Sequence, residues 1–279
     1  MTRVAIAGKD SYIGTRAARA LTLAGIEARE IDVRQGVRDT DFAGADAVIC
    51  VAGIAHQPDC APERYFQVNR DLAVRVAKAA RAGGAKQFVY MSSMSVYGLT
   101  TGHITRDTPP APNTPYGQSK WEAEQALTQL ETDGFRVAIL RPPMVYGPGC
   151  KGNYPRLVAL TRRLPFFPKV NNERSMVFID TLCAFLVNLV QSGGGGLFFP
   201  QEREYVRTDE LARLAARCHG KRLWLVPGFG WLLRWLAPSV TLVGKAFGSL
   251  TYEHAMAHEP APENALSFEE TIRRTEVGG

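Results

Sequence analysis

Apolar and polar residues form two kinds of pattern along this chain. The segments 4–7, 26–31, 47–53, 87–91 and 135–140 are short, and most are apolar without interruption, as strands buried on both faces of a parallel sheet are. Between them, apolar residues at helical spacing predict helices that end near Gly25, run from Asn69 to Ala82, and begin at Pro115. The alternation predicts an α/β fold with a Rossmann-like, doubly wound parallel sheet.

The connection after the second predicted strand is short. Only about a dozen residues separate Asp32 from the next strand, too few for another strand and a crossover helix. We therefore expect the sheet to lack one strand of the usual doubly wound set, or to carry it as a stub.

The composition of the sequence changes near Cys150. Beyond it the loops are longer and richer in Pro and Gly, and the predicted helices are shorter. We expect one domain over residues 1–150, to which 175–200 return, and a smaller lobe over 151–279.

Composition narrows the class of protein. The 279 residues are 46% hydrophobic and 22% charged, and the formal net charge of +6 is spread without any basic run of five residues. This argues against nucleic-acid binding and fits an anionic small molecule. Five dispersed cysteines without metal-ligand spacing predict reduced thiols and no metal site, and the apolar run at 4–7 is too short for a signal peptide, so we expect a cytoplasmic protein.

The first predicted strand leads into a glycine turn and then a helix. Gly8 and Gly14 keep the six-residue spacing of a dinucleotide-binding turn, but Ser11 stands at its middle glycine position. A plain strand–helix turn remains an equal alternative. Asp32, about 20 residues later, favours NAD because a carboxylate can bind both ribose hydroxyls. Arg34 and Arg38 would favour NADP unless they are solvated loop charges.

The candidate catalytic residues lie between Gln87 and Lys120. Tyr116 and Lys120 stand four apart at the start of a predicted helix, so they share one face. A nearby ammonium lowers the pKa of a phenol and suits it to proton transfer. Ser93 follows a predicted strand, where its hydroxyl can reach the same substrate oxygen. The Tyr-x-x-x-Lys spacing alone is weak, because both residues are common on solvated helix faces.

Taken in order, these motifs resemble the extended short-chain dehydrogenase/reductases, in particular the NAD-dependent epimerase/dehydratase branch that acts on nucleotide sugars. The segments SSMSVYG (92–98), LRPPMVYGP (140–148) and RSMVFID (174–180) are similar to three motifs of that branch. The family's Asn before Val-Tyr-Gly is Met144 here, so one substrate-phosphate contact must come from elsewhere.

The resemblance makes residues 1–150, with 175–200, the NAD(P)-binding domain and residues 151–279 mainly the substrate-binding lobe. It also implies roles for individual residues. Tyr116 would be the acid/base, Lys120 would hold the nicotinamide ribose, and Ser93 would bond the reacting sugar oxygen. Asn69 could instead simply cap its predicted helix. Implied cofactor contacts are Gly8, Ser11, Tyr12, Ile13, Gly14, Asp32, Val33, Arg34, Ala52, Gly53, Asn69, Tyr116, Lys120, Pro142 and Pro143, and implied substrate contacts are Ser95, His56, Asn153 and Arg174.

Two reactions remain open under this resemblance. Dehydratases carry an acidic pair after the catalytic Ser/Thr, and this chain has Met94 and Ser95 there, so we set dehydration aside. We expect an NAD-dependent UDP-hexose 4-epimerase, with an NAD(P)H-dependent UDP-4-keto-6-deoxy-sugar 4-reductase as the alternative. A non-catalytic NAD(P)-binding sensor is a second alternative. The partner would be a UDP-sugar, and we expect a homodimer.

The longest apolar stretch, 223–250, contains Trp224, Trp231 and Trp235 and is interrupted by prolines and cations. It does not resemble a membrane span. Packing against the small lobe or a second subunit is the favoured interpretation, and docking on a membrane surface is the less favoured one.

Overall fold

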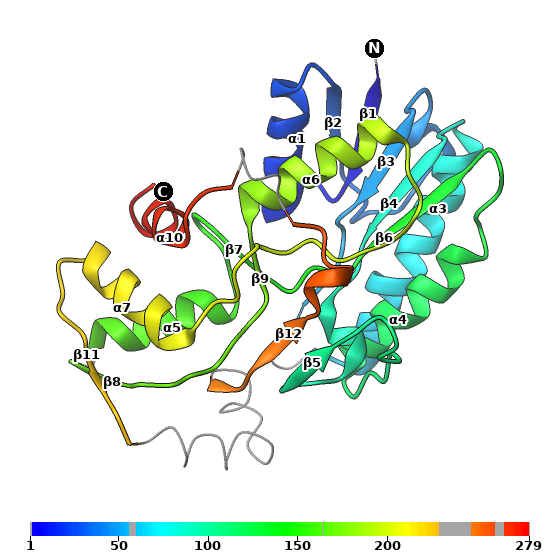
Figure 1. Cartoon of the computed structure of the whole chain (residues 1–279). Coiled ribbons are helices and arrows are strands. Elements are labelled where there is room, and N and C mark those ends of the chain that lie inside the picture. Colours follow the sequence, from blue (N-terminus) through cyan, green and yellow to red (C-terminus); the bar gives the residue numbers. More distant parts are fainter. Residues whose placement is uncertain (1, 56–59, 164, 229–246, 260–264, 279) are drawn as a thin grey trace. The chain divides into compact units, whose positions relative to one another are not determined.

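The computed structural model describes residues 2–55, 60–163, 165–228, 247–259 and 265–278 (Figure 1). The chain divides into two compact units, and each is described by itself. Unit 1 comprises Met1–Gly98, Pro109–Pro142 and Leu182–Pro200, and unit 2 comprises Leu99–Thr108, Pro143–Thr181 and Gln201–Gly279. Within the described residues, no helix has the length and apolar character that crossing a membrane would require.

A parallel six-stranded sheet forms the centre of unit 1, which confirms the predicted α/β class. Its strand order is β10-β6-β4-β3-β1-β2. The inner strands are buried along nearly their whole length, as their apolar sequences require. The strands are β1 (Arg3–Ala7), β2 (Glu27–Ile31), β3 (Ala47–Cys50), β4 (Gln87–Met91), β6 (Arg136–Leu140) and β10 (Gly196–Phe198).

The outer edge of this sheet ends at β2. Among the described residues no strand pairs beyond it, and the chain passes through a single 3₁₀ turn, η1 (Asp39–Phe42), to β3. This confirms the expected loss of one strand. Phe42 of η1 is fully buried and packs into the core beside the sheet, so the short connection still contributes apolar contacts.

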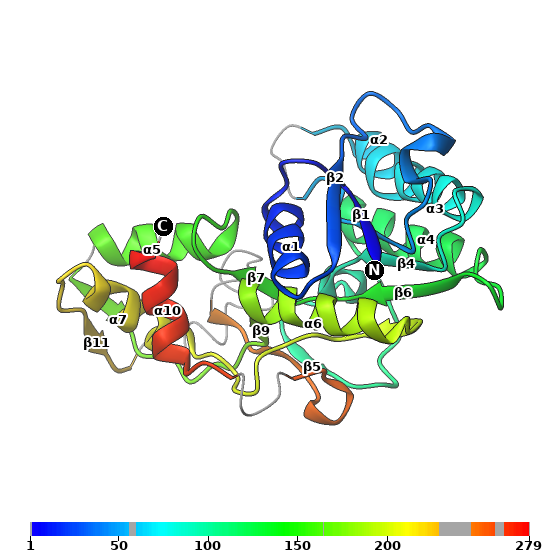
Figure 2. The ribbon, with the colours of Figure 1, turned by 90° about the horizontal axis from the view of Figure 1, so that it is seen from above.

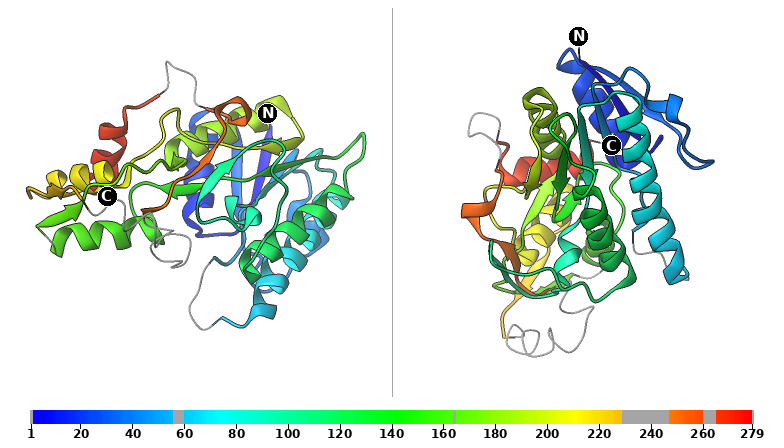
Figure 3. Two further views of the ribbon diagram at one scale, coloured as in Figure 1. Left: turned by 60° about the horizontal axis from the view of Figure 1, so that its bottom comes forward. Right: turned by 90° about the vertical axis from the view of Figure 1, so that its right-hand side faces the viewer.

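Helices cover both faces of the sheet. Figure 2 shows α1 (Tyr12–Leu23) and α6 (Ile179–Ser192) on one side and α3 (Leu72–Ala82) and α4 (Pro115–Thr128) on the other. Figure 3 shows α3 and α4 side by side, and the main core lies between them and the sheet. A 3₁₀ turn, η3 (Met94–Tyr97), follows β4.

The helix predicted to start at Asn69 begins earlier. α2 (Pro62–Tyr65), a π-helical turn η2 (Phe66–Asp71) and α3 form one continuous helical run. Pro62 occupies the first turn, where the absent N–H costs nothing, and this start signal was missed. Asn69 therefore does not cap a helix: it lies in the π turn, a feature that often marks functional sites.

Unit 2 is built from short strand pairs and four described helical segments. Tyr146, Phe167 and Phe178 are fully buried in its cores. The strand pairs are β5 (Gly102–Ile104) with β12 (Leu250–Tyr252), β7 (Met144–Tyr146) with β9 (Met176–Phe178), and β8 (Phe166–Pro168) with β11 (Trp224–Val226). The helices are α5 (Asn153–Arg163), α7 (Thr208–Cys218), η4 (His254–Met256) and α10 (Phe268–Val277).

Candidate active site

The turn after β1 brings backbone very close to backbone. Gly8 has φ +125°, and a Cβ there would lie 2.9 Å from the Ala52 nitrogen. A Cβ on Gly14 would lie 2.4 Å from Ser11 Oγ. The Ser11 hydroxyl accepts a hydrogen bond from the Gly14 N–H (3.2 Å) as the N-cap of α1. The serine at the middle-glycine position thus caps the helix, whose first-turn N–H groups, at residues 12–14, suit an anionic phosphate.

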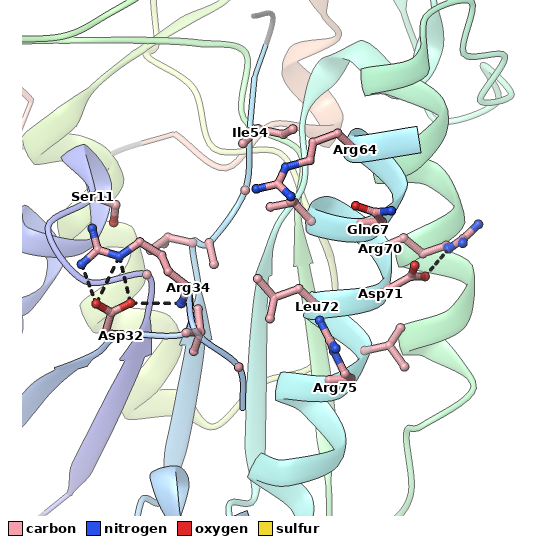
Figure 4. Close-up of a pocket in the computed structure, with 18 of the residues that line it drawn as sticks. Ser11, Asp32, Arg34, Ile54, Arg64, Gln67, Arg70, Asp71, Leu72 and Arg75 are labelled. Atoms are coloured by element: carbon pink, nitrogen blue, oxygen red, sulfur yellow. Dashed lines mark hydrogen bonds and ion pairs between the residues drawn. The ribbon is translucent and has the colours of Figure 1, made fainter. Parts of the chain in front are cut away.

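A cavity of about 930 Å³ opens beside this turn (Figure 4). Figure 4 shows Ser11, Asp32 and Arg34 on one side of it and the side chains of α2, η2 and α3 on the other. The predicted cofactor residues that line it are Gly8, Ser11, Asp32, Val33, Arg34, Ala52 and Gly53. The residues fit a dinucleotide, because the tight glycine turn leads into the N-terminus of α1 and the end of β2 supplies a carboxylate.

Asp32 and Arg34 form a paired unit at the end of β2. Arg34 Nε and Nη2 donate to the two carboxylate oxygens at 2.9 and 2.5 Å, and the Arg34 N–H donates at 3.0 Å. These hydrogen bonds lower the pKa of Asp32 to about 2. The carboxylate is therefore ionised, and the guanidinium lies in the same cavity.

The opposite wall carries cations that the sequence analysis did not single out. Arg64 of α2 and Arg75 of α3 line the cavity together with Gln67. A helix begun at Pro62 would have placed these side chains near one face, so the missed start explains the omission. The cavity combines two carboxylates, Asp32 and Asp71, with four guanidinium groups, and this excess of cations suits a polyanionic ligand.

Ser93 stands where β4 ends. It is the N-cap of η3, and its Oγ accepts a hydrogen bond from the Ser95 N–H (3.1 Å). Its hydroxyl also hydrogen-bonds with Tyr116. The structure therefore brings together two of the three predicted catalytic side chains.

Tyr116 is the second residue of α4, which Thr114 caps and Pro115 opens. Its ring packs edge-on against Tyr65, with centroids 6.3 Å apart. Burial raises the pKa of Tyr116, and the hydrogen bond from Ser93 only partly offsets this. The expected lowering of that pKa by Lys120 is therefore not seen in the chain alone, because burial of the phenol dominates.

Lys120 lies one helical turn further on and is 5% exposed. Its Nζ donates to the Met91 carbonyl (2.8 Å) at the end of β4. Burial lowers the pKa of Lys120 to about 8. A Cβ on Gly53 would lie 3.2 Å from this Nζ, so Gly53, which also lines the cavity, leaves room for the ammonium. The lysine is thus adjacent to the predicted cofactor space.

Asn69 joins three segments around this lysine. Its amide accepts from the Ile54 N–H (2.8 Å) and donates to the Ile54 carbonyl (3.0 Å) and to Ser119 Oγ (3.0 Å). Ser119 in turn donates to the Tyr116 carbonyl (2.9 Å). The π turn thus fixes the loop after β3 against the start of α4.

A buried ion pair lies one turn beyond Lys120, and the sequence analysis did not find it. Arg141 at the end of β6 donates to Glu124 through Nε (3.1 Å) and Nη2 (2.6 Å), and both side chains are under 7% exposed. Ser92 Oγ donates to the same carboxylate, and Arg141 Nη1 donates to the Tyr97 hydroxyl (2.7 Å). The pair links α4 to the ends of β4 and β6. Glu124 and Arg141 are 17 residues apart and lie in different elements, so no local spacing indicates the pair.

The remaining predicted residues are divided between the units. Ser95 and Pro142 belong to unit 1, where the Met94 N–H donates to the Pro142 carbonyl (3.0 Å). Pro143, Asn153 and Arg174 belong to unit 2. Arg174 Nη1 donates to the Gly248 carbonyl (2.8 Å), and burial lowers the pKa of Arg174 to about 10. Another predicted substrate residue, His56, lies outside the described residues.

Comparison with known proteins gives this geometry a family. Residues 4–196 match the model of the NAD dependent epimerase/dehydratase family. UDP-glucose 4-epimerase of Vibrio cholerae is 30% identical over 88% of this chain and 82% of that protein.

Two solved structures share the fold. UDP-glucuronic acid 4-epimerase of Bacillus cereus with NAD has TM-score 0.75 at 15% identity, covering 99% of this chain and 97% of that one. RMD of Pseudomonas aeruginosa with NADPH has TM-score 0.71 at 19% identity, covering 99% and 98%. The resemblance is confirmed, and the chain belongs to the NAD-dependent epimerase/dehydratase family of nucleotide-sugar epimerases and reductases.

Proposed function

We propose that this protein is an NAD-dependent nucleotide-sugar 4-epimerase that transiently oxidises C4 of a UDP-hexose. The observation that carries the proposal is the cluster of Ser93, Tyr116 and Lys120. These residues meet where β4 ends and α4 begins, next to Gly53 and the cavity. A relative that is 30% identical over 88% of this chain is named UDP-glucose 4-epimerase.

Each of the three side chains has a defined task. Bound nicotinamide would take up and return the two electrons of the C4–H bond. Tyr116 would take the C4 hydroxyl proton and later return it to the same oxygen, while Ser93 donates a hydrogen bond to that oxygen. Lys120 would turn its ammonium from the Met91 carbonyl toward the ribose and phenol, where its charge stabilises the phenolate and counters the effect of burial.

Several other residues would hold the ligands. Ser11 and residues 12–14 would receive the pyrophosphate, Asp32 the adenosine ribose, and Pro142 and Pro143 would back the nicotinamide. Arg174 would bind the substrate diphosphate, a role that suits a planar fork of donors. His56, Ser95 and Asn153 are the other proposed substrate contacts.

Substitution of Tyr116 by Phe tests the proposal. The ring and its contact with Tyr65 remain, so cofactor affinity should stay within about twofold, whereas turnover of UDP-glucose should fall by at least about 10²-fold because the proton-transfer group is lost. NAD affinity is measured by titration calorimetry and turnover by chromatography of the sugar nucleotides. Unchanged turnover would refute the assignment of Tyr116, and a wild-type protein that binds NAD but turns over no sugar would favour the sensor.

A 4-keto-sugar reductase is the second candidate. Arg34 beside Asp32, with Arg64 and Arg75 across the cavity, would also accommodate the 2′-phosphate of NADPH. The two reactions use the same three catalytic groups. They differ in whether the cofactor stays bound through the cycle or leaves after one transfer.

A further inference from the structure

Unit 2 exposes two aromatic side chains directly opposite each other on one short sheet. In the parallel pair β8–β11, Phe166 is the partner of Trp224. Phe166 is 59% exposed and Trp224 is 52% exposed. Their neighbours Phe167 and Leu223 point the other way and are buried against α7. Because side chains alternate along a strand, burying Phe167 and Leu223 forces the two large rings outward. Figure 1 shows β8 and β11 side by side.

Cationic residues precede both strands, and one of them stacks on the aromatic pair. The Arg222 guanidinium lies 4.2 Å from the centroid of the Trp224 ring. Lys221 Nζ donates to the Arg162 carbonyl (2.5 Å), and the Trp224 N–H donates to the Pro165 carbonyl (3.0 Å), so the two segments are held together. We name this surface the β8–β11 patch: Arg162, Arg163, Phe166, Lys221, Arg222 and Trp224.

The charge of the patch is unusual for this chain. Residues 160–169 and 217–226 contain six Lys and Arg and no Asp or Glu. The other 27 Lys and Arg equal the 27 Asp and Glu. Four of the six cations belong to the patch, and Arg217 pairs with Glu269 (3.7 Å). Within the described part of the chain, no carboxylate forms an ion pair with the charged side chains of Arg162, Arg163, Lys221 or Arg222.

We propose that the β8–β11 patch docks the protein on the surface of an anionic lipid bilayer. Aromatic rings side by side suit the headgroup region, where their apolar parts are buried, and the flanking long cationic stems reach lipid phosphates. The combination of apolar insertion and charge attraction supplies the two signals that stable peripheral binding needs. Arg222 already covers one face of the Trp224 indole, which makes the patch a poorer platform for stacking nucleic-acid bases.

This inference reverses the preference drawn from the sequence for the beginning of the apolar stretch. The sequence favoured packing of the stretch against the small lobe or a second subunit, and the half-exposed Trp224 is not packed into the small lobe. Trp231 and Trp235, the other tryptophans of that stretch, lie outside the described residues, and the proposal does not use them.

Co-sedimentation of the full chain with vesicles tests the proposal. Vesicles of phosphatidylcholine alone are compared with a 7:3 mixture of phosphatidylcholine and phosphatidylglycerol at 0.1 M salt. We expect binding to the anionic vesicles at least about tenfold tighter than to the neutral ones. F166A/W224A and R162E/R163E should each weaken it at least about tenfold.

Matched controls separate docking from bulk charge. R19E/K78E changes the net charge as much as R162E/R163E does, but on exposed positions of α1 and α3 in unit 1, and L23A removes an isolated residue that is 80% exposed. These variants should bind like wild type, and circular dichroism melts check that all fold. Loss of binding in the controls, or its survival in F166A/W224A, would overturn the proposal.

Two further outcomes would also overturn it. If wild type does not bind anionic vesicles but is a dimer by light scattering, and F166A/W224A is a monomer, the patch covers a second copy of this chain. If a single-stranded 20-mer binds the patch more tightly than vesicles do, its ligand is nucleic acid. Sugar-nucleotide turnover in free solution should be unchanged in all these variants, so failure here is distinguishable from failure of the proposed function.

Discussion

Removing the charge of Glu124 should destabilise unit 1 strongly. Glu124 and Arg141 are 3% and 6% exposed at their side chains, and the guanidinium donates to both carboxylate oxygens. Glu124→Gln keeps the shape but leaves the Arg141 charge buried without a counter-ion, which costs about 3–5 kcal/mol. For a unit of this size that corresponds to a fall in Tm of roughly 6–20 °C.

A matched control lies on the same helix. Glu122 accepts a hydrogen bond from Arg70 (2.5 Å), but those side chains are 30% and 36% exposed, so Glu122→Gln should cost less than about 1 kcal/mol. Thermal unfolding of both variants is followed by circular dichroism. Equal, small losses of Tm would show that burial of the pair does not dominate its energetics and would refute the reasoning.

The same substitution should affect turnover. Ser92 donates to Glu124 and directly precedes Ser93, so loosening the carboxylate loosens the end of β4. We expect Glu124→Gln to lower kcat more than it changes KM, because Ser93 and Tyr116 would lose their mutual position rather than ligand contacts. An effect on KM alone would contradict this.

Three further predictions concern the cofactor cavity. Gly8→Ala should abolish NAD binding in calorimetry, because its Cβ would lie 2.9 Å from the Ala52 nitrogen at φ +125°; retained affinity would contradict the tight turn. Burial lowers the pKa of Lys120 from 10.5 to about 8, so between those pH values the unfolded chain holds more protons at this site. The unfolding free energy of wild type should therefore rise with pH relative to that of Lys120→Met. Denaturant titrations at pH 8 and 10 that give both proteins the same change in unfolding free energy would contradict the buried ammonium. Arg34→Ala should shift the NADPH-to-NADH affinity ratio toward NADH, since Asp32 would then face the ribose without its cation; an unchanged ratio in fluorescence titrations would exclude Arg34 from the 2′ position.

Much of unit 1 could be predicted from the sequence because its signals are local. Apolar strands, the strand–turn–helix at Gly8 and the Pro115 helix start each depend on neighbouring residues, and the parallel sheet and the missing strand followed from their order. Ser93 and Tyr116 were placed correctly relative to each other because both lie at element ends.

The signals that were missed depend on distant residues. The π turn places the Asn69 amide against the Ile54 backbone, a contact that no periodicity indicates. The pKa of Tyr116 in the chain alone is raised by burial in the whole unit, an effect that the local Tyr–Lys spacing does not contain. Glu124 and Arg141 are 17 residues apart and meet only when α4 packs on the sheet.

One measurement tests the proposed epimerase most directly. The purified protein is denatured and the released nicotinamide is assayed, while a parallel sample is incubated with UDP-glucose and UDP-N-acetylglucosamine without added cofactor. We expect retained NAD together with conversion of a sugar nucleotide to its C4 epimer. A protein without bound nicotinamide that stays inert until it receives NAD(P)H and a 4-keto sugar would contradict the epimerase and assign the same site to a reductase.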